Sequence, residues 1–163
     1  MIQEKMVSAL NDQFALELYS TNLYLAMSAW CENKNLPGFA RWLRIQAEEE
    51  RSHAMKLFDY LVDQGAQVKV PAVQQPEGQY EGLVHLFKEV LGHERKITEA
   101  IYRLQGLAAE LNDYATRGLL DWFVKEQIEE EKNAGLLLAH LEMVGDRGGA
   151  ILQLDHIAGK RGE

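Results

Sequence analysis

The sequence predicts an all-α protein in which four long helices form one bundle and a short fifth helix follows. Only three prolines interrupt the 163 residues, and the stretches between them are rich in Leu, Ala, Glu, Lys and Gln, which favour helices. Apolar residues recur at alternating steps of three and four, the spacing of one helix face. Apolar residues make up 47% and charged residues 26% of the chain, a balance typical of a globular domain. We therefore expect a single domain over residues 1–163.

Four long helices are expected at about 4–33, 37–64, 80–111 and 114–144. The connections within the first pair and within the last pair are only a few residues long, so the members of each pair must be antiparallel neighbours. The stretch 65–80 contains two of the three prolines and is long enough to run the full height of the bundle. The four-helix bundle therefore covers about 4–144 in an up-down-down-up order.

A short fifth helix is expected at about 149–159, after Gly145, Gly148 and Gly149. Its apolar residues are Ile151, Leu152, Leu154 and Ile157. A helix of this length is too short to be stable alone, so we expect it to dock on this chain or on another.

Charge and composition exclude several classes of function. The net charge of −8 disfavours binding to nucleic acid or to anionic membranes and favours attraction of cations. No apolar run approaches the roughly 18 residues that cross a bilayer, and no targeting segment is visible at the N-terminus. The single cysteine, Cys31, cannot form an intrachain disulfide or a thiolate metal site. We expect a cytoplasmic protein without nucleic-acid or membrane partners.

Polar residues interrupt the apolar face of each long helix. On the third helix, the face that runs from Leu83 to Leu111 contains Glu94 as its one polar residue. The groups that interrupt the four faces are Glu17, Glu50, His53, Glu94, Gln127 and Glu130. Any one of these could lie at an exposed edge of the bundle, and His53 alone could be an ordinary core histidine. Together they indicate a polar site inside the core.

The spacing of these residues places them at one level. Glu50 follows Glu17 by 33 residues, and Gln127 follows Glu94 by 33. Residues equally far from a connecting turn lie level in an antiparallel helix pair, so the two halves present equivalent groups in the middle of the bundle.

This set of side chains favours a pair of metal ions. Buried carboxylates are costly unless they are neutralised, paired or bound to metal. The basic residues nearby in the sequence fall off the core faces, at Arg51, Lys56, Arg95, Lys125 and Lys132. Oxygen ligands with one imidazole and one amide suit iron or manganese better than structural zinc. We predict iron, because a redox-active ion would give such a site a chemical function.

The pattern Glu17, Glu50-x-x-His53, Glu94 and Gln127-x-x-Glu130 resembles the ferroxidase centre of non-haem ferritins, a carboxylate arrangement already known for ferritin-like bundles. The resemblance covers essentially the whole chain, including the long connection and the fifth helix. It implies an iron-storage protein that oxidises Fe(II) with O2 or H2O2 at a dinuclear centre. It also implies that Fe(III) mineral is deposited inside a hollow homo-oligomeric shell of 24 chains.

The resemblance also implies a role for each residue. One iron would be held by Glu17, Glu50 and His53, and the second by Glu94, Gln127 and Glu130, with Glu50 as the bridge. The family's tyrosine at the site matches Tyr24, which could instead be plain core packing. A third iron site would be formed by Glu49, Glu126, Glu129 and Glu130. These acids, apart from Glu130, could instead be a solvated face, and Trp122 beside the centre could serve packing alone.

Two departures from relatives matter. Bacterioferritins carry a haem-ligating Met between the Glu and His of the first motif, where this chain has Arg51 and Ser52, so no haem is expected. Animal ferritins line their iron channels with acidic residues, and the matching positions here are Arg117 and Leu120. The sequence therefore does not predict the route by which iron enters the shell.

Two other functions are compatible with a di-iron bundle. A peroxide scavenger such as a rubrerythrin would carry a four-cysteine electron-transfer module, which one cysteine cannot supply. A ferritin subunit that only nucleates mineral would lack the full ligand set, which is intact here.

Overall fold

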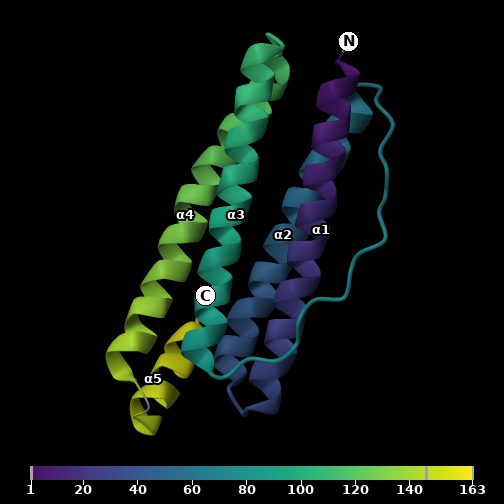
Figure 1. Ribbon diagram of the computed structural model, residues 1–163. Helices are drawn as coiled ribbons and strands as arrows, with labels where there is room; N and C mark the ends of the chain where they lie inside the picture. The colour runs from purple at the N-terminus through teal and green to yellow at the C-terminus, as the bar shows by residue number, and fades with distance from the viewer. Residues whose placement is uncertain (1, 146, 163) are drawn as a thin grey trace.

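The computed structural model describes residues 2–145 and 147–162, which form five helices and no strand. The helices are α1 (Glu4–Asn33), α2 (Pro37–Asp63), α3 (Leu83–Glu110), α4 (Tyr114–Val144) and α5 (Gly148–Ala158). Figure 1 shows the first four as one elongated bundle, with α5 at the end opposite the N-terminus. The α1 helix packs on α2 and the α3 helix on α4, so the predicted all-α four-helix bundle is confirmed.

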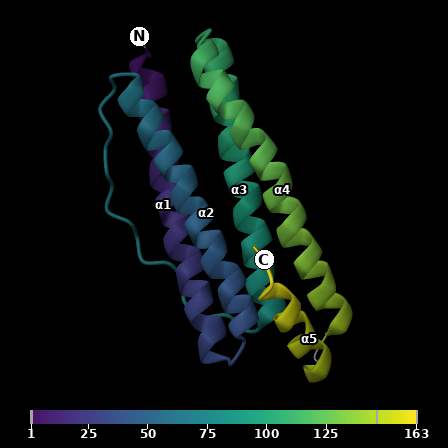
Figure 2. The same ribbon diagram turned by 180° about the vertical axis from the view of Figure 1, so that it is seen from behind.

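A long connection between α2 and α3 runs down the outside of the bundle, as Figures 1 and 2 both show. It returns the chain to the end from which α2 began, so α2 and α3 run parallel and the up-down-down-up order is confirmed. The α3 helix begins at Leu83, not near residue 80 as predicted. Gly82 is fully extended, with φ 174°, and the Tyr80 ring packs edge-on against Trp30 at 5.8 Å. Tertiary packing on α1 therefore delays the start of the helix.

The remaining predicted boundaries differ from the structure by at most one residue. The α1 and α4 ranges agree, α2 ends one residue earlier, and α5 is displaced by one residue toward the N-terminus.

The first three helices end in the same way. A residue with a left-handed backbone follows each helix: Asn35 with φ 60°, Gly65 with φ 67° and Asn112 with φ 54°. The next backbone N–H in each case bonds a carbonyl five residues back, as from Asp113 to Ala108 at 2.9 Å. Asn and Gly adopt this conformation at low cost, so these residues fix where each helix stops.

The α5 helix docks on this chain, at the start of α2. The Asp155 carboxylate accepts a 2.8 Å hydrogen bond from the backbone N–H of Phe39, which caps a helix whose own N-cap residue supplies no side-chain bond. The backbone of α5 passes so close that a Cβ at Gly38 would lie 1.7 Å from the Asp155 carbonyl oxygen. Only glycine fits at this contact.

The apolar core consists of two clusters at opposite ends of the bundle. One includes Tyr24, Phe39, Phe87 and Leu141, and the other includes Leu10, Leu57, Ile101 and Phe123. The buried carboxylates occupy the level between them. The polar layer is therefore enclosed at both ends by packed side chains.

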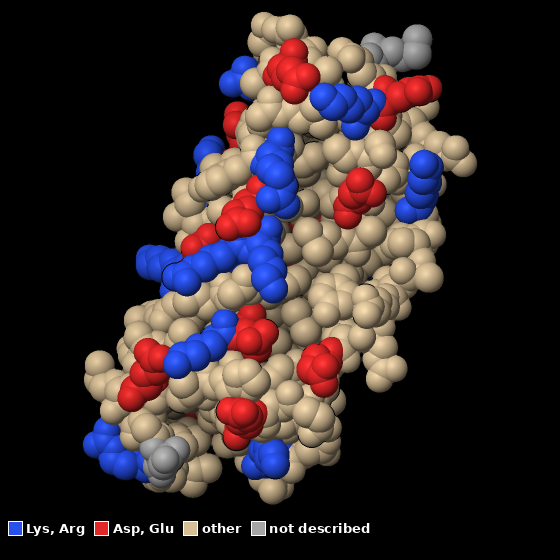
Figure 3. All heavy atoms as spheres, in the orientation of Figure 1, with Lys and Arg blue, Asp and Glu red and all other residues tan. Residues whose placement is uncertain are grey.

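The outer face of α3 and α4 mixes charges of both signs (Figure 3). Ion pairs across the two helices include Lys88 with Glu142 at 3.2 Å and Arg95 with Glu131 at 3.8 Å. Among the described residues, no helix combines the length and the apolar character needed to span a membrane.

Candidate metal centre

The six residues predicted to converge all lie inside the bundle, with exposed fractions of 0–4%. They come from all four long helices: Glu17 from α1, Glu50 and His53 from α2, Glu94 from α3, and Gln127 and Glu130 from α4. Their helices are held in register by the apolar clusters above and below. The packed helices therefore place these six side chains at the same height in the bundle that their sequence spacing predicts.

Two glutamines orient the carboxylates of α1 and α2. Gln13 donates a 2.7 Å hydrogen bond to one oxygen of Glu17, one helical turn away. Gln46 donates to Glu50 at 3.0 Å and to Glu130 at 2.7 Å. The Gln46 amide therefore links Glu50 of α2 to Glu130 of α4.

The other half of the site is organised around Glu94. One oxygen of this carboxylate accepts a hydrogen bond from the Tyr24 hydroxyl. The other accepts from the amide of Gln127 at 3.2 Å, and the same amide also reaches the Glu94 backbone carbonyl at 3.2 Å. Tyr24 therefore packs in the core and also donates a hydrogen bond to a candidate ligand of the centre.

Two buried polar atoms in the layer lack a hydrogen-bond partner: Glu17 Oε2 and His53 Nδ1. The distance from His53 Nδ1 to Glu50 Oε2 is 3.6 Å, too long for a hydrogen bond. Ligand atoms of Glu17, Glu50 and His53 lie within 4.8 Å of one another. Unpaired buried polar atoms are costly, and a metal ion among these three side chains would satisfy both.

The pKa values show how the layer is stabilised without metal. Burial, and then the charge of Glu50, raise the pKa of Glu17 well above its usual range. Burial with the charges of Glu50 and Glu130 does the same for the pKa of Glu94. Burial alone would raise the pKa of Glu50, but His53, Glu17 and Gln46 outweigh it and lower that pKa. The carboxylates therefore share protons when no cation is present.

Protonation of Glu130 predicts that the metal-free protein loses stability as pH rises. Burial, followed by the charge of Glu50, raises the pKa of Glu130 to about 7, whereas the pKa of a glutamate in the unfolded chain is about 4.3. Between these values the folded state binds more protons than the unfolded state, so its stability falls with rising pH. The melting temperature of the metal-free protein should fall between pH 5 and 8, and a Glu130→Gln variant should show a shallower fall. An equal slope in both would contradict this origin.

The residues predicted for a third iron site are not all together. Glu126 and Glu130 form a second group with His53, whose ligand atoms lie within 4.8 Å of one another. Glu49 is paired with Arg161 from the tail after α5. Glu129 is exposed and belongs to neither group. The Trp122 ring stands edge-on to the His53 imidazole, with 5.4 Å between ring centres.

The sequence predicted no role for some residues that contact the candidate ligands. Gln13 and Gln46 lie four residues before Glu17 and Glu50, and this repeated Gln-to-Glu spacing is a signal that could have identified them as partners. Thr98 contacts Gln127 at 3.4 Å and has a signal of the same kind, since it lies four residues after Glu94. Arg161 offers no such signal, because its partners lie more than 110 residues away.

The chain is similar to known proteins along nearly its whole length. The family model described as a ferritin-like domain matches residues 7–144. A bacterial non-heme ferritin of Escherichia coli O157:H7 is 40% identical over 155 residues, which are 95% of this chain and 94% of that protein. One from Staphylococcus aureus (strain NCTC 8325 / PS 47) is 34% identical over 161 residues, 99% of this chain and 97% of that protein.

Solved structures show the same similarity in three dimensions. An open pore ferritin from the archaeon Archaeoglobus fulgidus superposes with a TM-score of 0.98 at 39% identity, over 99% of each chain. A closed form of the same ferritin, engineered by mutagenesis, gives 0.97 at 39% identity, over 99% of this chain and 98% of that one. The chain belongs to the ferritin family, and bacterial non-haem ferritins are among its relatives.

Proposed function

We propose that this protein stores iron and is a ferroxidase, which binds two Fe(II) ions per chain and oxidises them to Fe(III). The observation that supports this most directly is the pair of unpartnered buried atoms, Glu17 Oε2 and His53 Nδ1, beside the Glu50 carboxylate. A bundle that needed only stability would not retain them, because apolar side chains of the same size would cost less.

The two halves of the site supply one iron position each. Glu17, Glu50 and His53 hold the first ion, and Glu50 also bridges to the second. The second ion is held by Glu94, Gln127 and Glu130. Four carboxylates with one imidazole and one amide suit Fe(II), and binding releases the protons that the metal-free carboxylates share. The protein provides spacing and shielding, while the metals carry the redox chemistry.

The oxidation is balanced by a two-electron acceptor. Each Fe(II) loses one electron, and O2 takes up two electrons and two protons to leave as H2O2. With H2O2 as the oxidant, two electrons and two protons give two water molecules. The Tyr24 hydroxyl bonded to Glu94 lies in contact with the reacting centre.

An accessory iron site lies next to the centre in this proposal, formed by Glu49, Glu126, Glu129 and Glu130. The closeness of Glu126 and Glu130 to His53 supports a cation at this place. Glu49 is half-buried and Glu129 is exposed, so both are more open to solvent than Glu130. Such a site would let Fe(III) leave the dinuclear centre along a path of carboxylates.

Storage requires an enclosed volume that one bundle cannot provide. Because its relatives are ferritins, we propose that the chain assembles into a hollow shell of 24 copies, in which Fe(III) mineral forms. The net charge of −8 per chain favours the accumulation of iron cations at such a shell.

Adding Fe(II) to the metal-free protein in air tests the proposal. Fe(III) should form much faster than in protein-free buffer, with about two Fe(II) oxidised per chain in the first phase. The particle, measured by light scattering, should be far larger than a dimer and should retain iron after gel filtration. Oxidation at the protein-free rate would refute the ferroxidase, and a particle no larger than a dimer at every salt concentration would refute the shell.

A further inference from the structure

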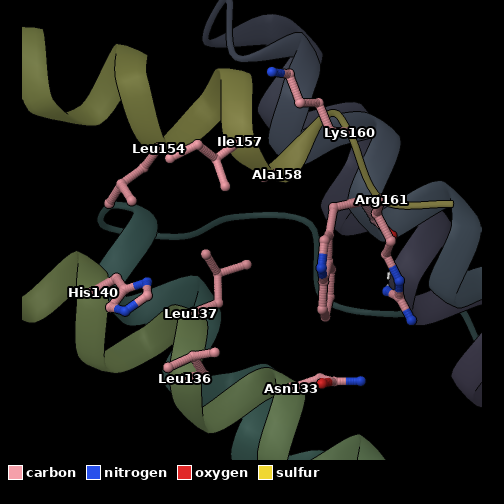
Figure 4. Close-up of a pocket in the computed structure, with 10 residues that line it drawn as sticks. Asn133, Leu136, Leu137, His140, Leu154, Ile157, Ala158, Lys160 and Arg161 are labelled. Carbon is pink, nitrogen blue, oxygen red and sulfur yellow. Dashed lines mark hydrogen bonds between the residues drawn. The ribbon is translucent and has the colours of Figure 1, made fainter. Parts of the chain in front are cut away.

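The tail that follows α5 returns to the metal centre through Arg161. The side chain of this arginine is 17% exposed, and its guanidinium lies 4.3 Å from the centre of the Trp42 ring. Figure 4 shows Arg161 at the edge of a pocket of about 380 Å³ between α4 and α5, whereas Lys160 points away from it. The arginine is thus held in a defined place beside α2.

One arm of the guanidinium fixes the orientation of Gln46. Arg161 Nη1 donates a 2.8 Å hydrogen bond to Gln46 Oε1. Because that oxygen is engaged, the amide nitrogen must face the centre, where it donates to Glu50 and Glu130. The tail is therefore connected to both halves of the dinuclear site through one side chain.

The other arm neutralises Glu49. Arg161 Nη2 forms a charge-assisted hydrogen bond with Glu49 Oε2. The guanidinium thereby occupies one of the two oxygens that Glu49 could offer to a metal ion in the accessory site. A divalent cation and Arg161 cannot both bind that oxygen at full strength.

We propose that Arg161 is an internal competitor for the accessory metal site, so that a cation binds Glu49 only by displacing the C-terminal tail. This inference rests on the proposed function, because it assumes the accessory site formed by Glu49, Glu126, Glu129 and Glu130. The competition makes the dinuclear centre fill first. The accessory site then fills only when the cation concentration is high enough to release the arginine.

Thermodynamic linkage makes the effect reciprocal. If Arg161 weakens metal binding at Glu49, metal binding weakens the attachment of the tail by the same factor. Glu49 is half-buried, so the ion pair is partly screened by solvent. Loss of the pair should tighten the accessory site by about fivefold, the factor expected for a partly exposed ion pair.

Zinc titration of the assembled, metal-free protein tests this inference, because Zn(II) occupies carboxylate sites without being oxidised. Arg161→Met keeps an apolar stem against Trp42 and removes the charge, and Lys160→Met removes the neighbouring charge as a matched control. Calorimetry should show that Zn(II) beyond two equivalents per chain binds about fivefold more tightly to Arg161→Met than to wild type. The Lys160→Met variant should bind like wild type.

Hydrogen exchange of residues 155–162 provides a second readout. Saturation with Zn(II) should increase exchange of this segment in wild type, and the segment should already exchange rapidly in Arg161→Met. If two equivalents bind but later ones bind equally well to wild type and Arg161→Met, the competition is refuted and the dinuclear centre stands. If wild type does not bind the first two equivalents, the centre itself is wrong and the inference falls with it.

Discussion

Replacing Glu50 and His53 together by alanine should lower the initial rate of Fe(II) oxidation at least about a hundredfold. Loss of residues that merely support a ligand already costs ~10–100-fold in metal affinity or activity, and here two direct ligands are removed, one of them the proposed bridge. The remaining carboxylates would hold at most one iron tightly. The rate is measured from the growth of Fe(III) absorbance after Fe(II) is added to metal-free protein in air.

The same variant should remain folded. Gln46 loses Glu50 as an acceptor but keeps Glu130 at 2.7 Å. Removal of His53 also removes one unpartnered nitrogen from the core. Circular dichroism and particle size should therefore match wild type. Glu48→Ala is the matched control, since Glu48 lies on the same helix but is exposed, and its oxidation rate should be unchanged. Equal rates in wild type and the double variant would show that oxidation occurs elsewhere.

Much of this architecture could be predicted from the sequence because the signals are local. Asn35 lies just past α1 and Asn112 just past α3, and the predicted ends of these two helices agree with the structure to within one residue. The level of the polar layer could also be predicted, because one short turn in each helix pair fixes the register of its two helices. The equal 33-residue intervals then required Glu17 and Glu50 to match Glu94 and Gln127.

Other features depend on contacts between distant segments and have no local signal. His93, for example, is buried and lies 2.7 Å from the Ser20 hydroxyl of α1, 73 residues away. Burial lowers the pKa of His93 to about 4, so this histidine is neutral. The pairing of Arg161 with Glu49 is of the same kind, because it depends on where α5 directs the tail. Neither helix periodicity nor residue spacing carries this information.

Placement of that tail depends on Gly38, and Gly38→Ala should destabilise the protein by about 2 kcal/mol or more. The new methyl group would lie 1.7 Å from the carbonyl oxygen of Asp155, so α5 must move away. The shift would break the bond from Phe39 N–H to Asp155, which caps α2, and caps are worth ~0.5–2 kcal/mol. Overpacking at a close contact adds ~1–3 kcal/mol.

Gly106→Ala provides the matched control for this substitution. A Cβ at Gly106, which is exposed within α3, would meet no atom within 4 Å, so this change should stabilise the protein by ~0.4–1 kcal/mol. Thermal unfolding should therefore shift in opposite directions for the two variants. Hydrogen exchange of residues 151–158 should rise in Gly38→Ala alone, and protection equal to wild type would contradict the close contact. Because the same displacement withdraws Arg161 from Glu49, Gly38→Ala should also tighten Zn(II) binding beyond two equivalents, as Arg161→Met does.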